Sequence, residues 1–415
     1  MNASYAEQLA SSRLRANYQE VRSTTLQLTE PFSPEDQMLQ SMPDCSPAKW
    51  HLAHTTWFFE TFILRQHLPG YQPFDPGFKR LFNSYYKQLG SHPYRGSRGL
   101  MSRPSLEQVR GYRASVDEAM QALLQTEEEK IAALVELGLN HEQQHQELIV
   151  TDLKHALWSM PLRPEQSNPP RLRSGSAPLS WIDFEGGMQE IGHAGAGFAF
   201  DNEGPRHQVF LPPFRIASRL VTNAEYLEFM NEDGYRRPEL WLSDGWDTVC
   251  AQGWKSPLYW EEQDGVWLEF SFEGLRELDP AAPACHVSYY EADAFAHWAN
   301  VRLPREEEWE VASGRAAGRG AFLESREFHA QPASGGGLEQ MFGDAWEWTA
   351  SPYVAYPGFS AAPGAIGEYN GKFMCNQLVL RGGSCATPEG HIRASYRNFF
   401  PPHARWQFMG IRLAQ

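Results

Sequence analysis

The stretch from residue 128 to residue 159 reads EEKIAALVELGLNHEQQHQELIVTDLKHALWS, and its apolar residues recur at three- and four-residue spacing. This spacing places them along one stripe of an α-helix. Three earlier segments show the same periodicity: residues 6–28, 47–66 and 105–126. Four such helices can bury their apolar stripes against one another. The first part of the chain is therefore expected to be a four-helix bundle.

Two of these helices carry start signals in the sequence. Ser46-Pro47 precedes the second helix, where serine can cap free amides and proline suits the first helical position. Ser105-Leu-Glu-Gln opens the third helix, and here a serine is followed closely by an acid. Ser46 and Ser105 are both expected to act as caps.

The character of the sequence changes at residues 161–180, which are rich in proline and serine and show little periodicity. Such a segment continues neither a helix nor a central strand. We therefore expect a helical bundle with a metal site at 1–160, a linker at 161–180, and a second domain at 181–415.

The second domain is expected to be loop-rich α+β, so that the whole chain combines an α domain with an α+β domain. Short β-like runs such as HQVFLPPFRIA (207–217) and QLVLRGG (377–383) lie among many Gly, Pro, Asn and Trp residues. Brief helices are expected at 222–231 and 289–300.

Composition excludes several classes of protein. The 415 residues are 42% hydrophobic, which suits a globular chain of two domains. The 36 Lys and Arg against 51 Asp and Glu give a formal net charge of −15, which repels polyphosphates, so nucleic acid is not an expected partner. No uninterrupted apolar run is long enough to span a membrane. The five cysteines form no C-x-x-C pair and the start has no apolar signal core, so a reducing cytoplasm is expected.

His141 and His145 lie four residues apart within the expected fourth helix, so both imidazoles share one face and can bind one metal ion. Two alternatives stand beside this hypothesis. The pair could occupy a solvated helix face, or His141-Glu142-x-x-His145 could be a zinc-hydrolase signature with Glu142 as general base. The extended signature needs a further glycine and histidine, which are missing, and Glu165 in the linker is a poor platform for a replacement ligand.

A third ligand is available on the second helix, in the run His51-Leu-Ala-His54. Facing helices of a bundle commonly build metal sites, and from the sequence either histidine could face the pair on the fourth helix. Three neutral imidazoles leave about half of an octahedral shell open, which suits a redox ion that holds a substrate and O₂ together. Iron is therefore favoured over a closed structural zinc. A thiol bound there would be deprotonated at neutral pH.

The chain resembles two known families in succession. Residues 49–60 (KWHLAHTTWFFE), 82–86 (FNSYY) and 141–148 (HEQQHQEL) resemble the DinB-like half of ergothioneine-biosynthesis sulfoxide synthases. Beyond the linker, the sequence is similar to the formylglycine-generating-enzyme fold, which is C-type-lectin-like. That similarity rests on GGMQEIG (186–192), FDNEGPRH (200–207), VTNAEY (221–226), RLPREEEW (302–309), GDAWEW (343–348), RGGS (381–384) and GIR (410–412).

The resemblance implies an activity and a set of iron ligands. These synthases are non-heme Fe(II) enzymes that use O₂ to join a thiol sulfur to C2 of the imidazole of Nα-trimethylhistidine (hercynine), giving a sulfoxide. The matching positions imply His54, His141 and His145 as ligands and leave His51 as a neighbour.

Three further residues of the first domain are implicated by the resemblance. Gln144 matches a position that contacts hercynine. Tyr85 and Tyr86 match the catalytic tyrosines of the subgroup that has none in its second domain. A phenol can donate a proton to reduced oxygen, while ordinary packing is the alternative for adjacent tyrosines.

The second domain is expected to close the site. Asn398 matches a position that contacts hercynine, and Phe399 and Phe400 would supply apolar walls, since aromatic faces hold a quaternary ammonium. Core packing is the alternative for the two phenylalanines. Formylglycine-generating enzymes bind copper through a cysteine pair, but residues 391–400 contain no cysteine. The domain is thus expected to keep the fold without that chemistry.

Arg95 and Arg98 are expected to bind the carboxylate of the thiol donor, because guanidinium geometry suits bidentate contact. A solvated charge cluster is the alternative. The family pattern has arginine directly after His-Pro, whereas this chain has Tyr94 there. Relatives that take γ-glutamylcysteine have an acidic residue where Phe400 stands, so another donor, such as free cysteine, is favoured.

Three kinds of function therefore stand. The first is the sulfoxide synthase, with selenoneine synthase, which joins a selenosugar to hercynine, as a close alternative. It predicts Fe(II) binding and oxygen uptake that depends on both substrates. The second is a zinc hydrolase that depends on Glu142. The third is a non-catalytic binding module, which predicts that no metal is retained.

Overall fold

The computed structural model describes residues 3–126, 128–163 and 175–415. Contacts between residues divide the chain into two compact units. The first is Met1–Pro161 with Gly364–Glu368, and the second is Leu162–Pro363 with Tyr369–Gln415. Residues 164–174 of the expected linker, Glu165 among them, lie outside the described residues. The sequence did not predict that residues 364–368 cluster with the first unit.

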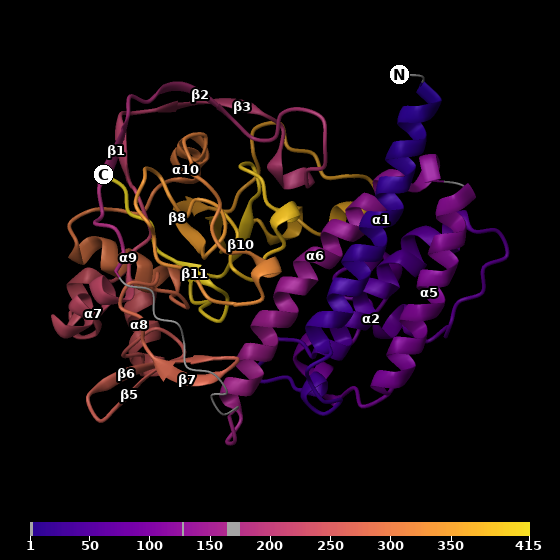
Figure 1. Ribbon diagram of the computed structural model, residues 1–415, viewed down its shortest axis with the longest axis horizontal. Coiled ribbons are helices and arrows are strands. Elements are labelled where there is room, and N and C mark those ends of the chain that lie inside the picture. The colour runs from indigo at the N-terminus through magenta and orange to yellow at the C-terminus, as the bar shows by residue number, and fades with distance from the viewer. Residues whose placement is uncertain (1–2, 127, 164–174) are drawn as a thin grey trace. The chain divides into compact units, whose positions relative to one another are not determined.

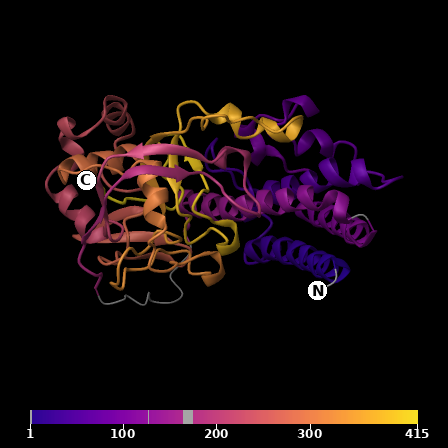
Figure 2. The same cartoon turned by 90° about the horizontal axis from the view of Figure 1, so that it is seen from above.

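The first unit is helical, as its apolar periodicity predicts (Figure 1). Helix α1 runs beside α6 (Figure 2), and α2 contacts α1, α5 and α6. The bounds are α1 Ala3–Thr29, α2 Ala48–Phe59, α3 Arg65–His67, α4 Phe78–Leu81, α5 Leu106–Thr126 and α6 Glu128–Ser159. The four long helices coincide closely with the expected segments, which confirms the bundle.

The expected second helix is longer than α2 alone because a π-helical turn, Glu60–Leu64, connects α2 to α3. Glu60 in that turn is fully buried. It accepts hydrogen bonds from the hydroxyls of Tyr71 (2.9 Å) and Tyr112 (3.0 Å) and from the amide of Phe74 (3.1 Å). These partners satisfy the carboxylate and tie the turn to α5.

The two predicted caps have different outcomes. Ser105 caps α5 as predicted, because its Oγ accepts from the Gln108 amide at 3.2 Å and Gln108 Oε1 accepts from the Ser105 amide at 2.9 Å. The prediction for Ser46 is wrong. The N-cap of α2 is Pro47 and has no side-chain cap, while Ser46 Oγ instead accepts a hydrogen bond from Arg98 at 2.9 Å. A buried guanidinium uses the hydroxyl that a helix start would otherwise take.

The described residues of the second unit form four small sheets. Its largest has the order β10-β9-β8-β11, in which β11 runs parallel to β8 and the other pairs are antiparallel. The strands are β1 Trp181–Phe184, β2 Gly187–Ile191, β3 His207–Leu211, β4 Phe214–Ala217, β5 Trp260–Gln263, β6 Val266–Ser271, β7 Gly274–Glu277, β8 Trp346–Pro352, β9 Leu378–Arg381, β10 Asn398–Phe400 and β11 Met409–Gly410. The predicted runs at 207–217 and 377–383 are confirmed as β3, β4 and β9.

Four helices accompany these sheets: α7 Asn223–Asn231, α8 Ser243–Gln252, α9 Tyr289–Trp298 and α10 Glu306–Ser313. Helices α7 and α9 confirm the two predicted segments. Each begins with a capping box, from Thr222 with Glu225 and from Ser288 with Glu291. The α+β character expected of this half is confirmed.

Within the described ranges, no helix combines the length and the apolar character that a membrane-spanning segment requires. All five cysteines are free thiols.

Candidate metal centre

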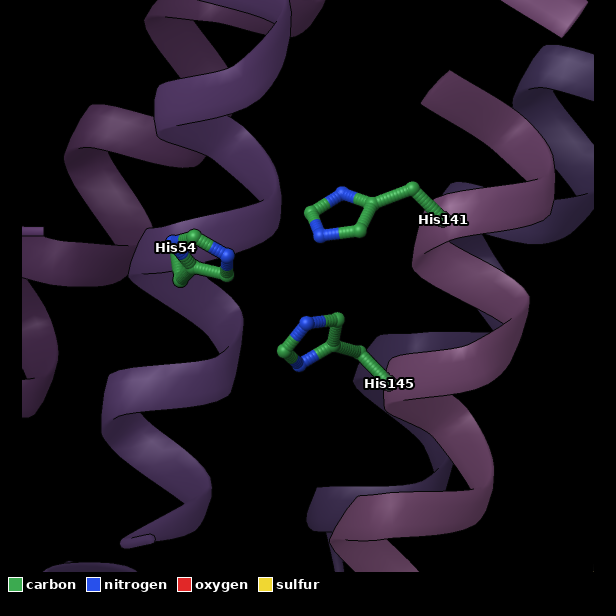
Figure 3. Close-up of side chains that lie close together, drawn as sticks. All are labelled: His54, His141 and His145. Atoms are coloured by element: carbon green, nitrogen blue, oxygen red, sulfur yellow. The ribbon is translucent and has the colours of Figure 1, made fainter. Parts of the chain in front are cut away.

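Three histidines from two helices converge inside the first unit (Figure 3). His54 projects from α2, and His141 and His145 project from successive turns of α6. One nitrogen of each lies within 4.8 Å of the others. Their ring centroids are 4.7 to 5.1 Å apart. No other group of three His, Cys, Asp or Glu side chains in the described part of the chain comes this close.

Burial keeps these three imidazoles neutral. Their exposed fractions are 2%, 7% and 8% for His54, His141 and His145. Burial lowers the pKa of His141 to about 4, and it lowers the pKa values of His54 and His145 well below the usual range, with the neighbouring histidines adding to the effect. Neutral imidazole is the form that binds a metal ion.

The remaining ring nitrogens show how the site suits a metal. His54 Nδ1 donates to the carbonyl oxygen of Phe82 at 2.6 Å, which leaves its Nε2 as the ligand atom. Nδ1 of His141 is buried and has no hydrogen-bond partner among the described residues. Such an orphaned buried polar atom is unusual in a folded protein. Three neutral histidines, one of them incompletely satisfied, fit a bound divalent ion.

Aromatic rings orient His54. Trp50 and Trp57, one turn before and one turn after it on α2, stack on its ring with centroid distances of 4.5 and 5.5 Å and interplanar angles of 13° and 14°. The sequence analysis did not assign a role to either tryptophan. Their spacing from His54, at i−4 and i+3, is the signal that they share its helix face.

His51, the other histidine of α2, contacts His145 and Asp152 and is not one of the three converging histidines. Its Nδ1 lies 2.7 Å from Nδ1 of His145, and its Nε2 lies 3.1 Å from Oδ2 of Asp152. Of the two candidates on α2, His54 is therefore the one placed with the pair, and His51 lies behind His145. Asp152 was not among the predicted site residues, although it lies seven residues after His145 and so on the same face of α6.

The contacts of Glu142 on α6 argue against the hydrolase hypothesis. Glu142 is fully buried and accepts hydrogen bonds from Arg22 (2.8 Å), Thr25 (2.7 Å) and Arg113. Burial alone would raise its pKa, but the two guanidiniums outweigh that effect and lower the pKa to about 2. A carboxylate that is bonded to two guanidiniums and a hydroxyl and has so low a pKa is a poor general base for a metal-bound water.

Arg98 is buried but has no carboxylate partner among the described residues. Its Nη1 and Nη2 donate to the hydroxyls of Ser46 (2.9 Å) and Ser84 (2.8 Å), and its guanidinium carbon lies 3.4 Å from the centroid of Trp50. It is 4% exposed. A buried cation of this kind, beside the tryptophan that stacks on His54, is suited to binding an anion.

Arg95 donates to the Tyr85 hydroxyl at 3.0 Å and also to the carbonyl of Asp44. Tyr94, the residue that departs from the family pattern, is 73% exposed. Tyr94 therefore lies at the surface, whereas Arg95, the next residue, contacts Tyr85.

The predicted tyrosines have unlike surroundings. Tyr85 is half-buried, with its hydroxyl bonded to Arg95. Tyr86 is 5% exposed, and its ring packs against Trp57 (5.6 Å) and Phe62 (5.2 Å). Gln144 is half-buried on α6 beside His145.

The predicted residues of the second unit form strand β10, which pairs with β9. Asn398, Phe399 and Phe400 are all half-buried. Phe399 stacks on Tyr353 at 4.0 Å, and Phe400 meets Trp406 edge to face at 5.6 Å. The sequence analysis missed the residue that precedes the strand.

That residue, Arg397, is fully buried and anchors the start of β10. It donates to both carboxylate oxygens of Glu306, at 2.9 and 3.0 Å, and to the carbonyl oxygen of Asn202 at 3.0 Å. Bidentate contacts of this type fix geometry strongly. The backbone that carries Asn398 is thus held in place by a buried ion pair.

Comparisons with known proteins agree with this architecture. Residues 17–149 match the model of the DinB superfamily, and residues 180–332 and 325–415 match that of the sulfatase-modifying factor enzyme 1-like domain. A hercynine oxygenase of Mycolicibacterium thermoresistibile is 34% identical over 95% of this chain and 93% of its own. One from Mycobacterium tuberculosis is 33% identical over 98% of each chain. A formylglycine-generating enzyme of Streptomyces coelicolor is 26% identical over 56% of this chain and 88% of its own. With a helical DinB-like unit, a sulfatase-modifying-factor-like unit and full-length similarity at this level, the chain belongs to the hercynine oxygenase family.

Proposed function

We propose that this protein is an O₂-dependent, non-heme iron enzyme of ergothioneine biosynthesis. It joins the sulfur of a thiol donor to C2 of the imidazole of hercynine and releases a sulfoxide. The convergence of three neutral histidines from two helices carries the proposal. The names of the full-length relatives support the oxygenase activity and hercynine as a substrate.

The overall reaction balances with one O₂. The S–H bond of the donor and the C2–H bond of the imidazole break, while a C–S bond and an S–O bond form. One oxygen atom stays on sulfur, and the other leaves as water with the two hydrogens. When bound by His54, His141 and His145, Fe(II) would supply the redox chemistry of O₂ and hold the donor sulfur as thiolate.

Arg98 is proposed to bind the donor's carboxylate. Its guanidinium is already desolvated, stacked on Trp50 and held by two serine hydroxyls, so little ordering is needed when an anion arrives. Arg95, three residues before Arg98, is proposed to bind the same carboxylate. The carboxylate of the donor would neutralise the positive charge of Arg98.

Tyr85 is proposed to supply a proton from its phenol oxygen. Because that oxygen accepts a hydrogen bond from Arg95, the phenolic hydrogen is the one it can donate toward reduced oxygen. Tyr86 is the second candidate, and its packing against Trp57 gives it a fixed position.

Gln144 and Asn398 are each proposed to contact hercynine, as the resemblance implies. Phe399 and Phe400 would hold the trimethylammonium, which cannot donate an N–H hydrogen bond and is held by aromatic faces.

The test is turnover by the purified chain. Protein loaded with Fe(II) is offered hercynine with cysteine, γ-glutamylcysteine or a selenosugar, and oxygen uptake and product mass are measured. We expect a sulfoxide of hercynine and oxygen uptake only when both substrates are present. A selenium-linked product as the main outcome would make the protein a selenoneine synthase. Turnover without O₂, or with Zn²⁺ alone, would contradict the proposal.

A further inference from the structure

His51 connects the metal centre to a buried carboxylate. Its Nδ1 lies 2.7 Å from Nδ1 of His145, and its Nε2 lies 3.1 Å from Oδ2 of Asp152. The exposed fractions of His51, His145 and Asp152 are 2%, 8% and 4%. Two hydrogen bonds thus run from α6 to α2 and back to α6, within the first unit and shielded from water.

The hydrogens of this chain can be assigned from its chemistry. A carboxylate only accepts, so Nε2 of His51 carries the hydrogen in the contact with Asp152. A neutral imidazole has one N–H, and Nδ1 of His51 is therefore an acceptor. The hydrogen in the 2.7 Å contact then belongs to Nδ1 of His145. With that tautomer, Nε2 of His145 presents its lone pair and can bind a metal ion.

We propose that His51 and Asp152 are positioning residues, which hold His145 in the Nδ1–H tautomer with its Nε2 ready for the metal. The inference rests on the metal centre of the proposed function. The carbonyl of Phe82 does the equivalent for His54. Nδ1 of His141 has no such partner among the described residues.

Asp152 itself is suited to this role. Its Oδ2 also accepts a hydrogen bond from the amide of Ser46 at 2.7 Å, while its Oδ1 has no partner among the described residues. An asparagine whose carbonyl oxygen takes the place of Oδ2 therefore keeps both contacts. A leucine of similar size keeps neither. Comparing Asp152→Asn with Asp152→Leu therefore distinguishes the effect of the hydrogen bonds from the effect of filling the space that the side chain occupies.

The experiment measures the affinity of the whole protein for Co²⁺, followed anaerobically by visible absorption in competition with a chelator. We expect His51→Phe and Asp152→Leu to weaken binding by about 10- to 100-fold, the usual effect of losing the hydrogen bond behind a ligand. Asp152→Asn should restore an affinity close to that of the wild type. His145→Ala removes a ligand and sets the scale of a broken site.

Tyr112→Phe is the matched control. It removes a buried hydrogen bond to Glu60 in the same bundle but keeps the aromatic ring, and in the described part of the chain Tyr112 has no hydrogen bond or ring contact with the three histidines. It should lower the midpoint of urea unfolding and leave Co²⁺ affinity unchanged. General destabilisation is thereby distinguished from loss of the positioning contact.

A second readout needs no metal. In metal-free protein labelled with ¹⁵N-histidine, long-range ¹H–¹⁵N correlation should show His145 as the Nδ1–H tautomer in the wild type and a mixture of tautomers in His51→Phe. Unchanged affinity and an unchanged tautomer in His51→Phe would overturn the inference while the proposed function stands. Failure of the wild type to bind Co²⁺ would overturn both.

Discussion

Helix α6 presents two faces whose chemistry is opposite although one short motif supplies both. On one face, His141 and His145 are neutral, lie among aromatic rings and leave a ring nitrogen without a partner. On the other face, Glu142 is charged and hydrogen-bonded to Arg22, Thr25 and Arg113. Successive helix positions differ by about 100°, so adjacent residues point in different directions. An incompletely satisfied face is available to a ligand, whereas a fully satisfied face holds the bundle together.

The largest effect is expected from breaking the histidine face. In His54→Ala, metal binding should be lost and product formation should fall to the level of metal-free protein, because two histidines on one helix do not hold the ion alone. Metal content by elemental analysis and turnover with hercynine and a thiol check this. The control His67→Ala removes a histidine at the end of α3 and should retain both properties.

The second effect concerns the acidic face. Glu142→Leu leaves Arg113 buried without its carboxylate. It also removes one of the two carboxylates that Arg22 contacts, the other being Asp117. Loss of one partner of a buried ion pair typically costs about 3–5 kcal/mol. We expect a matching fall in the free energy of urea unfolding, whereas Glu136→Gln at an exposed position of α6 should change it by less than about 0.5 kcal/mol. If folded Glu142→Leu kept wild-type stability but lost turnover, the carboxylate would have a catalytic role after all.

A third prediction contrasts paired and unpaired arginines. Arg98→Met should raise KM for the thiol donor by about 10- to 100-fold, as expected when a charged hydrogen-bond partner is lost. Its unfolding free energy should change little, because no carboxylate of the protein is left behind. Arg113→Met should show the reverse pattern, with reduced stability because the buried Glu142 loses one of its two guanidinium partners. Steady-state kinetics with varied donor, together with urea unfolding, separate the two.

The smallest effect concerns a buried histidine outside the metal centre. Burial, reinforced by Arg393, lowers the pKa of His391 to about 3. The unfolded chain takes up this proton near pH 6.5, so stability should be full above that pH and fall by about 1.4 kcal/mol per pH unit as pH drops toward 3. In His391→Phe that part of the pH dependence should vanish, which unfolding curves between pH 7 and pH 5 can measure. An unchanged slope would show that His391 takes up its proton over the same pH range in the folded and the unfolded protein, against this prediction.

Much of the fold could be predicted because its signals are local. The period of 128–159, the capping box at Ser105 and those that begin α7 and α9 all involve residues a few positions apart. Ser46 shows where this fails. Its hydroxyl was expected to serve its own helix, but it accepts from Arg98, 52 residues away.

The candidate site could be predicted only in part for the same reason. The spacing of His141 and His145 predicts a shared face, and the resemblance implies His54. The ion pairs of Glu142, the stacking of Trp50 on His54 and the contact between His51 and Asp152 depend on how helices are rotated against one another. The rotation of one helix relative to another cannot be predicted from a local sequence pattern.

The sequence by itself determined four amphipathic helices, a histidine pair one turn apart, a following strand-rich half and the likeness to a family. Only the tertiary structure decided that His54 rather than His51 joins the pair, that Glu142 is bonded to two arginines, and that Arg98 is buried with no carboxylate partner in the described part of the chain. The physical reason is that hydrogen bonding along a helix depends on near neighbours, whereas the chemistry of a buried side chain is decided by the groups that packing places around it.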